Sequence, residues 1–334
     1  MLNLEKFLEK YFSKDDKIIL ACSSGPDSMF LLYELLKTTY KDNLVVCYFN
    51  HKLRTESEEE EAFLEDLWKK LGFQVEIWYA YIKEIQAKIP SKNLEELARE
   101  KRYAFFDTIL HIYKAKYILT AHHLDDKIET FFFNLTRWSK LTGLINMTEK
   151  SSIILRPLLD ITKLEILEYL DKNNLKYFID KSNFESDFSR NYLRNEIIPK
   201  FEKLNFQFKN NIKTTLNYFE ELKFFIDEEV KKFLETPLTP LVRGGKSSFS
   251  DKRKISEGQR EFQISSFNSL STFLQKEVIR YIYYISNWNS TIWLSEANIA
   301  EIIKFINWKW NKTIKEIKLL KMKKDWDSIF YIFT

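Results

Sequence analysis

The sequence predicts an α/β domain with a doubly wound, mostly parallel sheet, followed by a smaller, mainly helical α+β domain. Over residues 1–205 short apolar runs alternate with helical patterns, as in a parallel sheet that carries helices on both faces. A turn of small residues at 23–28 joins the first apolar run to the first helical pattern. Beyond residue 205 the pattern is mainly helical and basic residues are in excess. These observations predict the fold class and the order of the domains.

The expected strands of the first domain are apolar and lie at 17–22, 44–50, 74–80, 115–121 and 152–155. Helical patterns fill the intervals between them, at 26–37, 56–71, 92–111 and 125–138. Gly72 follows the second helix, at the position of a C-terminal cap. Ligands of such folds bind beyond the carboxyl ends of strands. Ser23, His51 and His122 directly follow strands, so we expect them to share one crevice.

The whole chain is expected to have four parts. They are a catalytic domain at 1–205, a connecting helix at 206–235, a flexible insertion or linker at 236–262 and a basic domain at 263–334. The insertion holds three of the six glycines, which favours irregular structure. In the last part we expect helices at 272–286 and 295–307, then a hairpin that pairs 314–322 with 326–333.

Composition and charge exclude several classes of protein. No apolar run reaches the length of a membrane span, and the N-terminus lacks the apolar core of a signal peptide. The two cysteines, Cys22 and Cys47, fit a reducing cytoplasm and exclude an iron–sulfur cluster held by several cysteines. Residues 1–205 carry 31 basic and 33 acidic side chains, whereas 206–334 carry 21 and 15. This asymmetry indicates a catalytic domain joined to a polyanion-binding domain.

The turn Ser23–Ser28 is expected to bind phosphate. A strand, a tight turn and a helix start direct backbone N–H groups at one point, and the helix dipole adds positive potential. Pro26 suits the first helical position, where its missing N–H costs nothing. If Ser24 needs a positive φ, it carries a strain that glycine would not. A capped strand–helix turn without a ligand is the alternative interpretation of this segment alone.

His122, Asp126 and Glu129 form a second candidate site. Their spacing of i, i+4 and i+7 places them on one helix face if the helix begins early. Carboxylates suit Mg²⁺, which keeps several waters and binds nucleotide phosphates, and Asp27 and Asp126 are the expected ligands. The alternative is a capped helix start with acidic residues in its first turn.

Arginines complete the candidate site. Arg99 and Arg102, at i and i+3, are close enough to hold one phosphate or carboxylate, although an ion-pair face with neighbouring glutamates is the alternative. Arg190 and Arg194, at i and i+4, share a helix face and are expected to contact RNA phosphate or ATP. His51 is expected to line the nucleotide pocket.

These segments, in this order over residues 15–205, resemble tRNA(Ile)-lysidine synthase, of the PP-loop ATP pyrophosphatase superfamily with its adenine-nucleotide alpha-hydrolase-like fold. The turn 23–28 is similar to the SGGxDS signature, with Ser24 at the first glycine position. The segment 137–147 keeps Arg137, Gly143, Leu144 and Met147 of a glycine-rich family loop but lacks three of its glycines.

The resemblance implies ATP and Mg²⁺ as cofactors and a reaction in two steps. The wobble cytidine of a tRNA(Ile) with a CAU anticodon is adenylated at C2, and free L-lysine then displaces AMP to give lysidine. A cytoplasmic protein without a membrane partner is implied, and a homodimer is compatible with it. The resemblance assigns ATP binding to Ser23, Ser24, Gly25, Pro26, Asp27, Ser28, His51, Arg99 and Arg102, and catalysis to His122, Asp126, Glu129 and Arg194.

Other functions remain open. A tRNA thiolase would need paired cysteines, and Cys22 and Cys47 are not so spaced. A catalytically silent tRNA-binding protein is favoured by Ser24 and the missing loop glycines, and another PP-loop tRNA-modifying enzyme is also compatible. Near the C-terminus, Trp308 and Trp310 precede a lysine-rich segment, and we expect tRNA contact there. The alternative is core tryptophans beside a solvated strand face. The lysines are Lys312, Lys315, Lys318, Lys321, Lys323 and Lys324.

Overall fold

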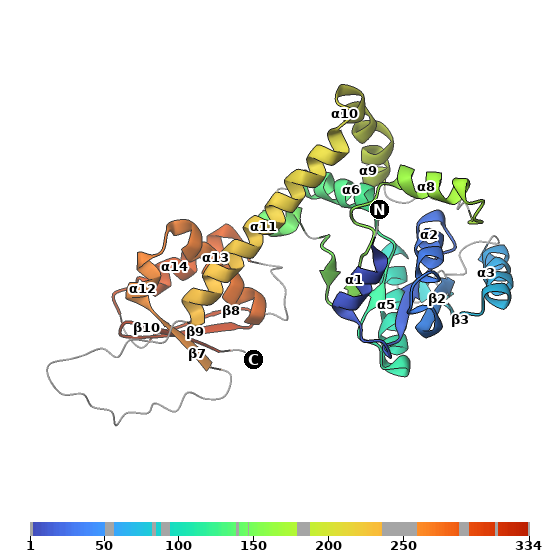
Figure 1. The fold of residues 1–334 in the computed structure, drawn as a ribbon. Helices are drawn as coiled ribbons and strands as arrows, with labels where there is room; N and C mark the ends of the chain where they lie inside the picture. The colour runs from blue at the N-terminus through green and yellow to red at the C-terminus, as the bar shows by residue number, and fades with distance from the viewer. Residues whose placement is uncertain are drawn as a thin grey trace. The chain divides into compact units, whose positions relative to one another are not determined.

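The computed structural model describes residues 3–50, 57–81, 85–87, 94–137, 140–145, 147–178, 188–235, 259–286, 294–310 and 313–332. The chain divides into two compact units, Met1–Asn217 and Tyr218–Thr334 (Figure 1). The division falls inside a long helix, α11 (Phe208–Glu235), and the expected boundary at 205 lies in the turn just before this helix. No described helix is long and apolar enough to cross a membrane.

The first unit is built on a six-stranded sheet with the order β3-β2-β1-β4-β6-β5. Its strands are β1 (Ile18–Ala21), β2 (Leu44–Asn50), β3 (Gln74–Tyr79), β4 (Ile118–Leu119), β5 (Lys150–Ser151) and β6 (Ile154–Leu155). Strand β1 pairs in parallel with both β2 and β4, and β6 is parallel to β4. The short β5 runs antiparallel to β6. The predicted doubly wound, mostly parallel sheet is therefore confirmed.

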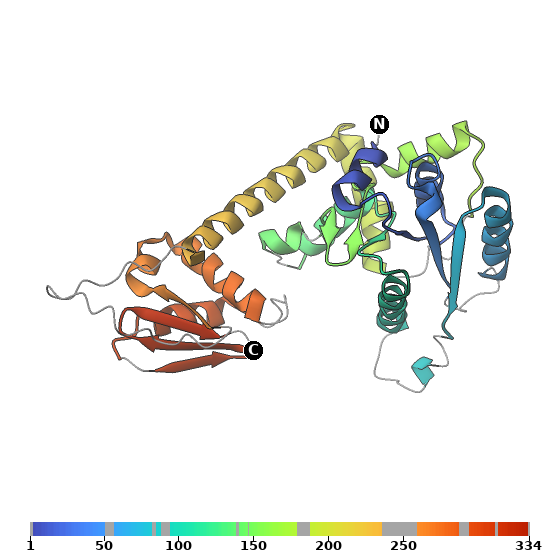
Figure 2. The same ribbon diagram turned by 60° about the horizontal axis from the view of Figure 1, so that its bottom comes forward.

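Helices cover both faces of this sheet (Figure 2). They include α1 (Leu4–Tyr11), α2 (Pro26–Leu35), α3 (Ser57–Leu71), α5 (Leu94–Tyr113) and α8 (Lys163–Lys172). Ile18 and Leu20 of β1 join the core formed with α1, α2, α3 and α8, whereas Ile19 joins the core formed with α5. Successive side chains of a strand point to opposite faces, so β1 reads as an uninterrupted apolar run.

A helical layer adjoins the end of β4 and contains α6 (Leu124–Leu135), α7 (Leu141–Leu144), α9 (Phe188–Tyr192), the π-helical segment η3 (Leu193–Ile197), α10 (Ile198–Leu204) and the start of α11. Ile128 of α6 packs with Ile198 of α10. The rings of Phe132, Phe201 and Phe208 stack on one another, with centroids 5.1–6.0 Å apart. This packing fixes α6 against the helices that follow it in the chain.

The second unit contains a four-stranded antiparallel sheet with the order β7-β10-β9-β8. Its elements are β7 (Gln259–Gln263), α12 (Ile264–Ser269), α13 (Thr272–Ser286), α14 (Glu296–Ile306), β8 (Ile314–Ile317), β9 (Leu320–Asp325) and β10 (Ser328–Ile332). The rings of Phe262, Phe267 and Tyr331 form part of its core. The predicted smaller α+β domain is confirmed, and the expected terminal hairpin is two successive hairpins.

Two expectations need correction. The expected linker at 236–262 extends too far toward the C-terminus, because residues 259–262 belong to β7. Residues 236–258 lie outside the described part of the chain. Helices α1, α8 and α12 were not predicted. For α8 a signal was present, because Thr162 and Glu165 form a capping box in which the Thr162 hydroxyl accepts from the Glu165 backbone N–H.

Candidate active site

The ends of β1 and β4 meet at the point where the order of the sheet reverses. After β1 the chain continues to β2 and β3 on one side, and after β4 it continues to β6 on the other. Open α/β sheets bind ligands in the crevice at this switch point. The turn 23–25 follows β1 there, and the segment 120–123 follows β4.

The turn after β1 has the conformation of a phosphate-binding loop. Ser24 has φ 59° and is buried, so the condition considered in the sequence analysis is met and the residue carries a strain of about 1–3 kcal/mol. Gly25 caps α2 at φ −67°, and Pro26 opens the helix as predicted. The Ser28 hydroxyl holds the turn closed, because it accepts from the Ser23 backbone N–H at 3.2 Å and donates to the Gly25 carbonyl at 3.0 Å.

Asp27, in the first turn of α2, is paired with a lysine that the sequence analysis missed. Lys163 Nζ lies 2.6 Å from Asp27 Oδ1. Lys163 is the first residue of α8, and its backbone N–H donates to Asp125 Oδ2 at 2.7 Å. The start of α8 thus holds carboxylates from two different segments of the site. The capping box at Thr162 was a signal for the start of this helix, but not for its place beside the site.

His123, rather than His122, occupies the centre of the site. Its Nε2 lies 3.6 Å from Asp27 Oδ1 and 3.5 Å from Asp126 Oδ2, and its ring is buried. Helix α6 begins at Leu124 with His123 as its N-cap, so His122 precedes the helix. The expected single helix face of His122, Asp126 and Glu129 is therefore wrong for His122, because the helix does not begin early enough.

His122 nevertheless lies within the electrostatic reach of Asp126. Its Nδ1 is 2.9 Å from Thr120 Oγ1. Desolvation lowers the pKa of His122 to about 4, and the charges of Arg156 and Arg102 add to this effect against the opposing charge of Asp126. Solvent still reaches the residue, which moderates the depression without changing its direction. His122 is therefore a neutral imidazole at neutral pH.

Glu129 and Arg194 form a bidentate ion pair. Arg194 Nε and an Nη donate to the two carboxylate oxygens at 2.6 and 2.8 Å, and Arg194 also lies 3.7 Å from Asp126 Oδ1. Burial raises the pKa of Glu129, although Arg194 opposes this, and the hydrogen bonds to Glu129 raise the pKa of Arg194. Arg194 lies in η3, and single π-helical turns are frequent at functional sites.

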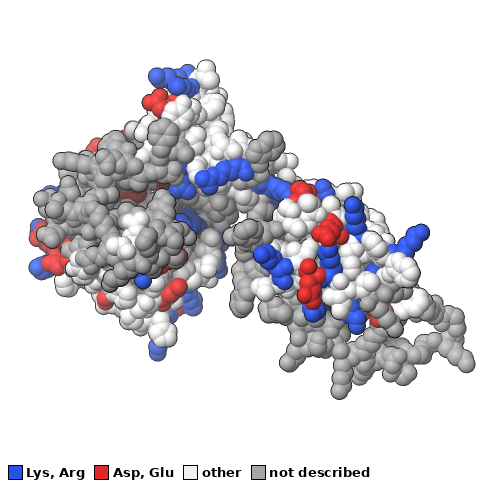
Figure 3. Space-filling model, turned by 180° about the vertical axis from the view of Figure 1, so that it is seen from behind, with Lys and Arg blue, Asp and Glu red and all other residues white. Residues whose placement is uncertain are grey.

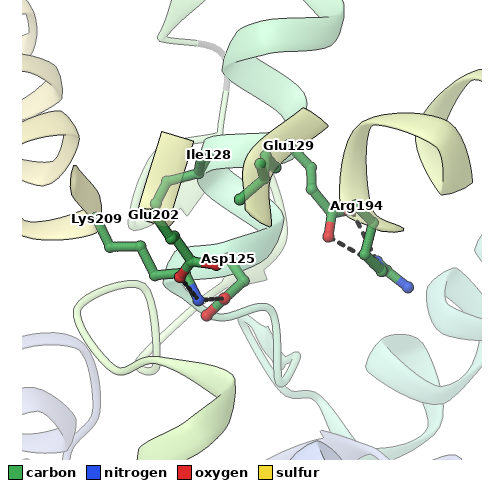
Figure 4. A pocket seen from close by; sticks show the side chains of 7 residues that line it. Asp125, Ile128, Glu129, Arg194, Glu202 and Lys209 are labelled. Carbon is green, nitrogen blue, oxygen red and sulfur yellow. Dashed lines mark hydrogen bonds and ion pairs between the residues drawn. The ribbon is translucent and has the colours of Figure 1, made fainter. Parts of the chain in front are cut away.

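A small cavity lies between α6, η3, α10 and α11 (Figure 4). At about 60 Å³ it holds a few water-sized groups, well below the ~300–1,000 Å³ of pockets that enclose larger ligands. Lys209 Nζ sits between Asp125 and Glu202, at 2.7 and 2.8 Å. Burial would raise the pKa of Asp125, but the hydrogen bonds from Lys209 and from the Lys163 backbone outweigh it and lower that pKa. The residues that line the cavity are Asp125, Ile128, Glu129, Arg194, Ile198, Glu202 and Lys209.

Arginines gather around His122 on the β6 side of the crevice. Arg156 directly follows β6, and one Nη donates to the Thr148 carbonyl at 2.9 Å. Its Nε is buried and has no hydrogen-bond partner among the described residues. Burial lowers the pKa of Arg156, and the charge of Arg99 contributes. The charge of Arg102 lowers the pKa of His122, and the charge of Arg99 lowers the pKa of Arg156. Both predicted arginines therefore lie on this side of the crevice.

The remaining expected residues are placed as follows. His51 lies outside the described residues, as do parts of the 137–147 loop. The guanidinium groups of Arg137 and Arg190 lie 3.9 and 5.1 Å from the centroid of the Phe133 ring. Arg190 and Arg194 are therefore engaged with different residues of α6.

Asp27 and Asp126 fit a nucleotide-dependent Mg²⁺ site. Both carboxylates approach His123 Nε2, and the buried Nδ1 of His123 has no hydrogen-bond partner among the described residues. No group of three or more His, Cys, Asp or Glu side chains suited to a metal occurs in the described part of the chain. Mg²⁺ commonly binds through one or two carboxylates plus the phosphates of its substrate, which matches a carboxylate pair beside a phosphate turn.

The lysine-rich segment of the second unit differs in part from expectation. Lys324 is 6% exposed, and its Nζ donates to the carbonyls of Ile306 and Trp308, so it supports the fold and is not available to RNA. Lys321 pairs with Glu316 at 2.6 Å. Trp308 and Trp310 are 55% and 72% exposed, so they are not core residues. On the face in Figure 3, basic and acidic side chains of this unit are interspersed.

Comparison with known proteins gives consistent relatives. A family model described as a PP-loop domain matches residues 1–201. The tRNA(Ile)-lysidine synthase of Persephonella marina is 36% identical over 68% of this chain and 52% of its own length. That of Bacillus cereus is 31% identical over 87% of this chain and 60% of its own length. The bifunctional protein TilS/HprT of Listeria monocytogenes is 31% identical over 92% and 47%.

The chain thus spans about half the length of the curated relatives it matches. Among solved structures, it is similar to the U34-tRNA thiolase NcsA from Methanococcus maripaludis with its [4Fe-4S] cluster. The TM-score is 0.53 at 19% identity, over 65% of this chain and 76% of that chain. This likeness supports the fold of the first unit.

Proposed function

Because this chain belongs to the PP-loop domain family, we propose that it uses ATP to join free lysine to a transfer RNA. The names of the relatives indicate tRNA(Ile) as the substrate, and the proposal adds that this tRNA carries a CAU anticodon. The wobble cytidine oxygen attacks the α-phosphorus of ATP and pyrophosphate leaves. An amine of lysine then attacks C2 of the adenylated base, and AMP leaves.

One observation carries this proposal: the phosphate turn after β1 leads into Asp27, whose carboxylate meets that of Asp126 at His123 Nε2 at the sheet's switch point. The N-terminus of α2, which Gly25 caps without a side-chain hydrogen bond, offers positive potential to the phosphates. Asp27 and Asp126 would hold Mg²⁺, which would neutralise charge on the leaving pyrophosphate. Lys163 is paired with Asp27 in this structure, so its ammonium group and Mg²⁺ would compete for the same carboxylate.

The second step needs a lysine amine that has lost its proton. The reference pKa of such an amine is about 10.4, so a base must accept the proton. His122 is a neutral imidazole at physiological pH and could accept it, although its lowered pKa makes it a weaker base than an ordinary histidine. Asp126 and Glu129 would hold the amine while it is still charged. Lys209, whose Nζ lies between Asp125 and Glu202, shows how two carboxylates of this chain hold an ammonium group.

The second unit is proposed to bind the tRNA. The part of the chain from 206 onward has the basic excess, and Trp308 and Trp310 offer exposed ring faces on which bases can stack. Lys321 and Lys323 occupy the exposed positions of β9. These features support contact with an RNA strand.

The alternative is a silent tRNA-binding protein. Ser24 was a reason to consider it, but Ser24 adopts the positive φ of the turn, so the substitution leaves the turn intact. The two functions are separated by incubating the protein with ATP, lysine and a CAU-anticodon tRNA. We expect pyrophosphate release that requires tRNA, and lysidine in the digested tRNA only when lysine is present. Tight tRNA binding without pyrophosphate release would contradict catalysis.

A further inference from the structure

Arg156 is the one arginine of the crevice with a buried donor that the described residues leave unused. Its Nη group is fixed by the Thr148 carbonyl, while its Nε is buried without a partner. A buried guanidinium donor without a partner is destabilising, so such a group is retained where a ligand satisfies it. The ligand that suits a guanidinium is an anion with two oxygens, a phosphate or a carboxylate.

A second observation, the positions of the neighbouring charges, indicates that this ligand is anionic. Arg99 lies close enough to Arg156 to disfavour its charged form, and Arg102 and Arg156 both act on His122. Arg99 is itself steadied by Tyr103, over whose ring its guanidinium lies at 5.1 Å. Like charges gathered at one place repel each other until an anion binds between them.

The order of the sheet separates this cluster from the phosphate turn. The turn follows β1, His122 follows β4 and Arg156 follows β6, so His122 lies between two anion-binding positions. Neighbouring strands are about 4.8 Å apart, which places the two positions roughly 10 Å from each other at the sheet edge. The proposed reaction brings two polyanions together, and the turn accounts for only one of them.

We propose that Arg156, with Arg99 and Arg102 beside it, binds a phosphodiester of the RNA strand next to the nucleotide that is modified. This inference rests on the proposed function, since it needs an RNA substrate. It makes Arg156 a substrate-binding residue, and it moves Arg99 and Arg102 from ATP to RNA.

The test uses the full chain with ATP and with a CAU anticodon stem-loop RNA, each titrated separately. Arg156→Gln keeps an amide donor for the Thr148 carbonyl but removes the charge. We expect RNA affinity to fall about tenfold and the slope of log K against log salt to decrease by about one, with ATP affinity unchanged. Lys116→Gln is the matched control, because Lys116 precedes β4 at the opposite edge of the sheet and pairs with Asp16.

A chemical change in the RNA sharpens the test. A neutral methylphosphonate replaces the phosphodiester adjacent to the wobble cytidine. It should weaken binding to the unmodified protein and to Lys116→Gln, but should weaken binding to Arg156→Gln much less, as in a double-mutant cycle. Equal weakening for all three proteins would overturn the contact. Arg156→Lys, which keeps the charge, should retain most of the salt slope and remains informative if Arg156→Gln folds poorly.

Two outcomes assign the cluster elsewhere. A loss of ATP affinity in Arg156→Gln with unchanged RNA affinity would show that the cluster binds the nucleotide, and no change in either would show that it binds neither. Lysine incorporation by the unmodified protein is measured in parallel. A protein that binds the RNA through Arg156 but transfers no lysine would contradict the proposed function and leave this inference standing.

Discussion

Lys163 and Asp27 form an ion pair of 2.6 Å that joins the first turn of α8 to the first turn of α2, across 136 residues of sequence. Asp27 also faces His123 Nε2 at 3.6 Å. This carboxylate is therefore the point at which three segments of the crevice meet, and it is the residue whose loss should affect the chemistry most.

Asp27→Asn should reduce pyrophosphate release at least a hundredfold, because the amide cannot replace the carboxylate as a ligand of Mg²⁺. The thermal unfolding midpoint should change little, since the side chain is partly exposed. The measurement is pyrophosphate release at saturating tRNA. Asp16→Asn removes a carboxylate that pairs with Lys116 away from the crevice and should leave turnover unchanged. Normal turnover in a folded Asp27→Asn protein would remove Asp27 from the site.

Ser24→Gly should leave turnover unchanged or improve it and should stabilise the protein, because glycine adopts φ 59° without strain. Ser24→Val should destabilise it, since a β-branched residue tolerates positive φ poorly. Thermal unfolding measures both changes. Lys114, exposed at φ 51°, is the matched control, and Lys114→Gly should give a similar stabilisation without any effect on turnover. A large loss of turnover in Ser24→Gly would instead give the buried Ser24 hydroxyl a role of its own.

Glu129→Gln should raise the lysine concentration needed for half-maximal rate about tenfold or more, because it removes the charge that faces an incoming ammonium group. Adenylation of the tRNA, measured by pyrophosphate release without lysine, should remain detectable. Glu202→Gln is the control, since Glu202 lines the same cavity but pairs with Lys209. An unchanged lysine dependence in Glu129→Gln would leave Glu129 as a structural partner of Arg194.

His122 should make stability depend on pH in the acidic range. Its pKa in the folded protein is lowered below the reference of about 6.5, so between these values the unfolded chain binds more protons than the folded one. The contribution of His122 to stability is present above pH 6.5 and is lost as the pH falls through this window. Denaturant unfolding from pH 4 to 8 measures it, and His122→Asn should flatten the curve. His111→Asn, in the last turn of α5, controls for the loss of a histidine elsewhere.

Replacement of Lys321 and Lys323 by Gln should weaken tRNA binding and reduce its salt slope by about two, one for each phosphate that the protein no longer neutralises. ATP affinity should not change. Lys324→Met provides the contrast, because it removes the hydrogen bonds to the Ile306 and Trp308 carbonyls and should lower thermal stability. If the double variant bound tRNA with an unchanged slope, β9 would have no part in RNA binding.

The sequence predicted those features that depend on neighbours in the chain. The apolar runs predicted the strands, and the order Ser23, Gly25, Pro26 predicted a turn and a helix start that the structure contains. A local comparison with glycine raised the question of a positive φ at Ser24, and the structure answered it.

Features that depend on packing between distant segments could not be predicted in this way. No periodic pattern relates Lys163 to Asp27 or Lys209 to Asp125. The centre of the site was assigned to His122 rather than to its neighbour because a shift of one residue in the helix start changes which histidine is the cap. The burial of Lys324 could have been predicted from the sequence, since it lies on the same strand face as Leu320 and Met322 in β9. It was not predicted because charged residues are rarely buried.

Cys22 occupies the residue just before the phosphate turn, and its thiol lies 3.6 Å from the Ser28 hydroxyl that closes this turn. Both Cys22 and Cys47 are buried, and burial raises the pKa of each thiol. An alkylating reagent can therefore reach Cys22 only when the turn opens, and its rate of reaction reports how often that happens. A nucleotide seated in the turn would slow this reaction, with Cys47 in the neighbouring strand as the internal reference. The unsubstituted protein thus carries its own reporter of site occupancy, one that needs no catalysis to be read.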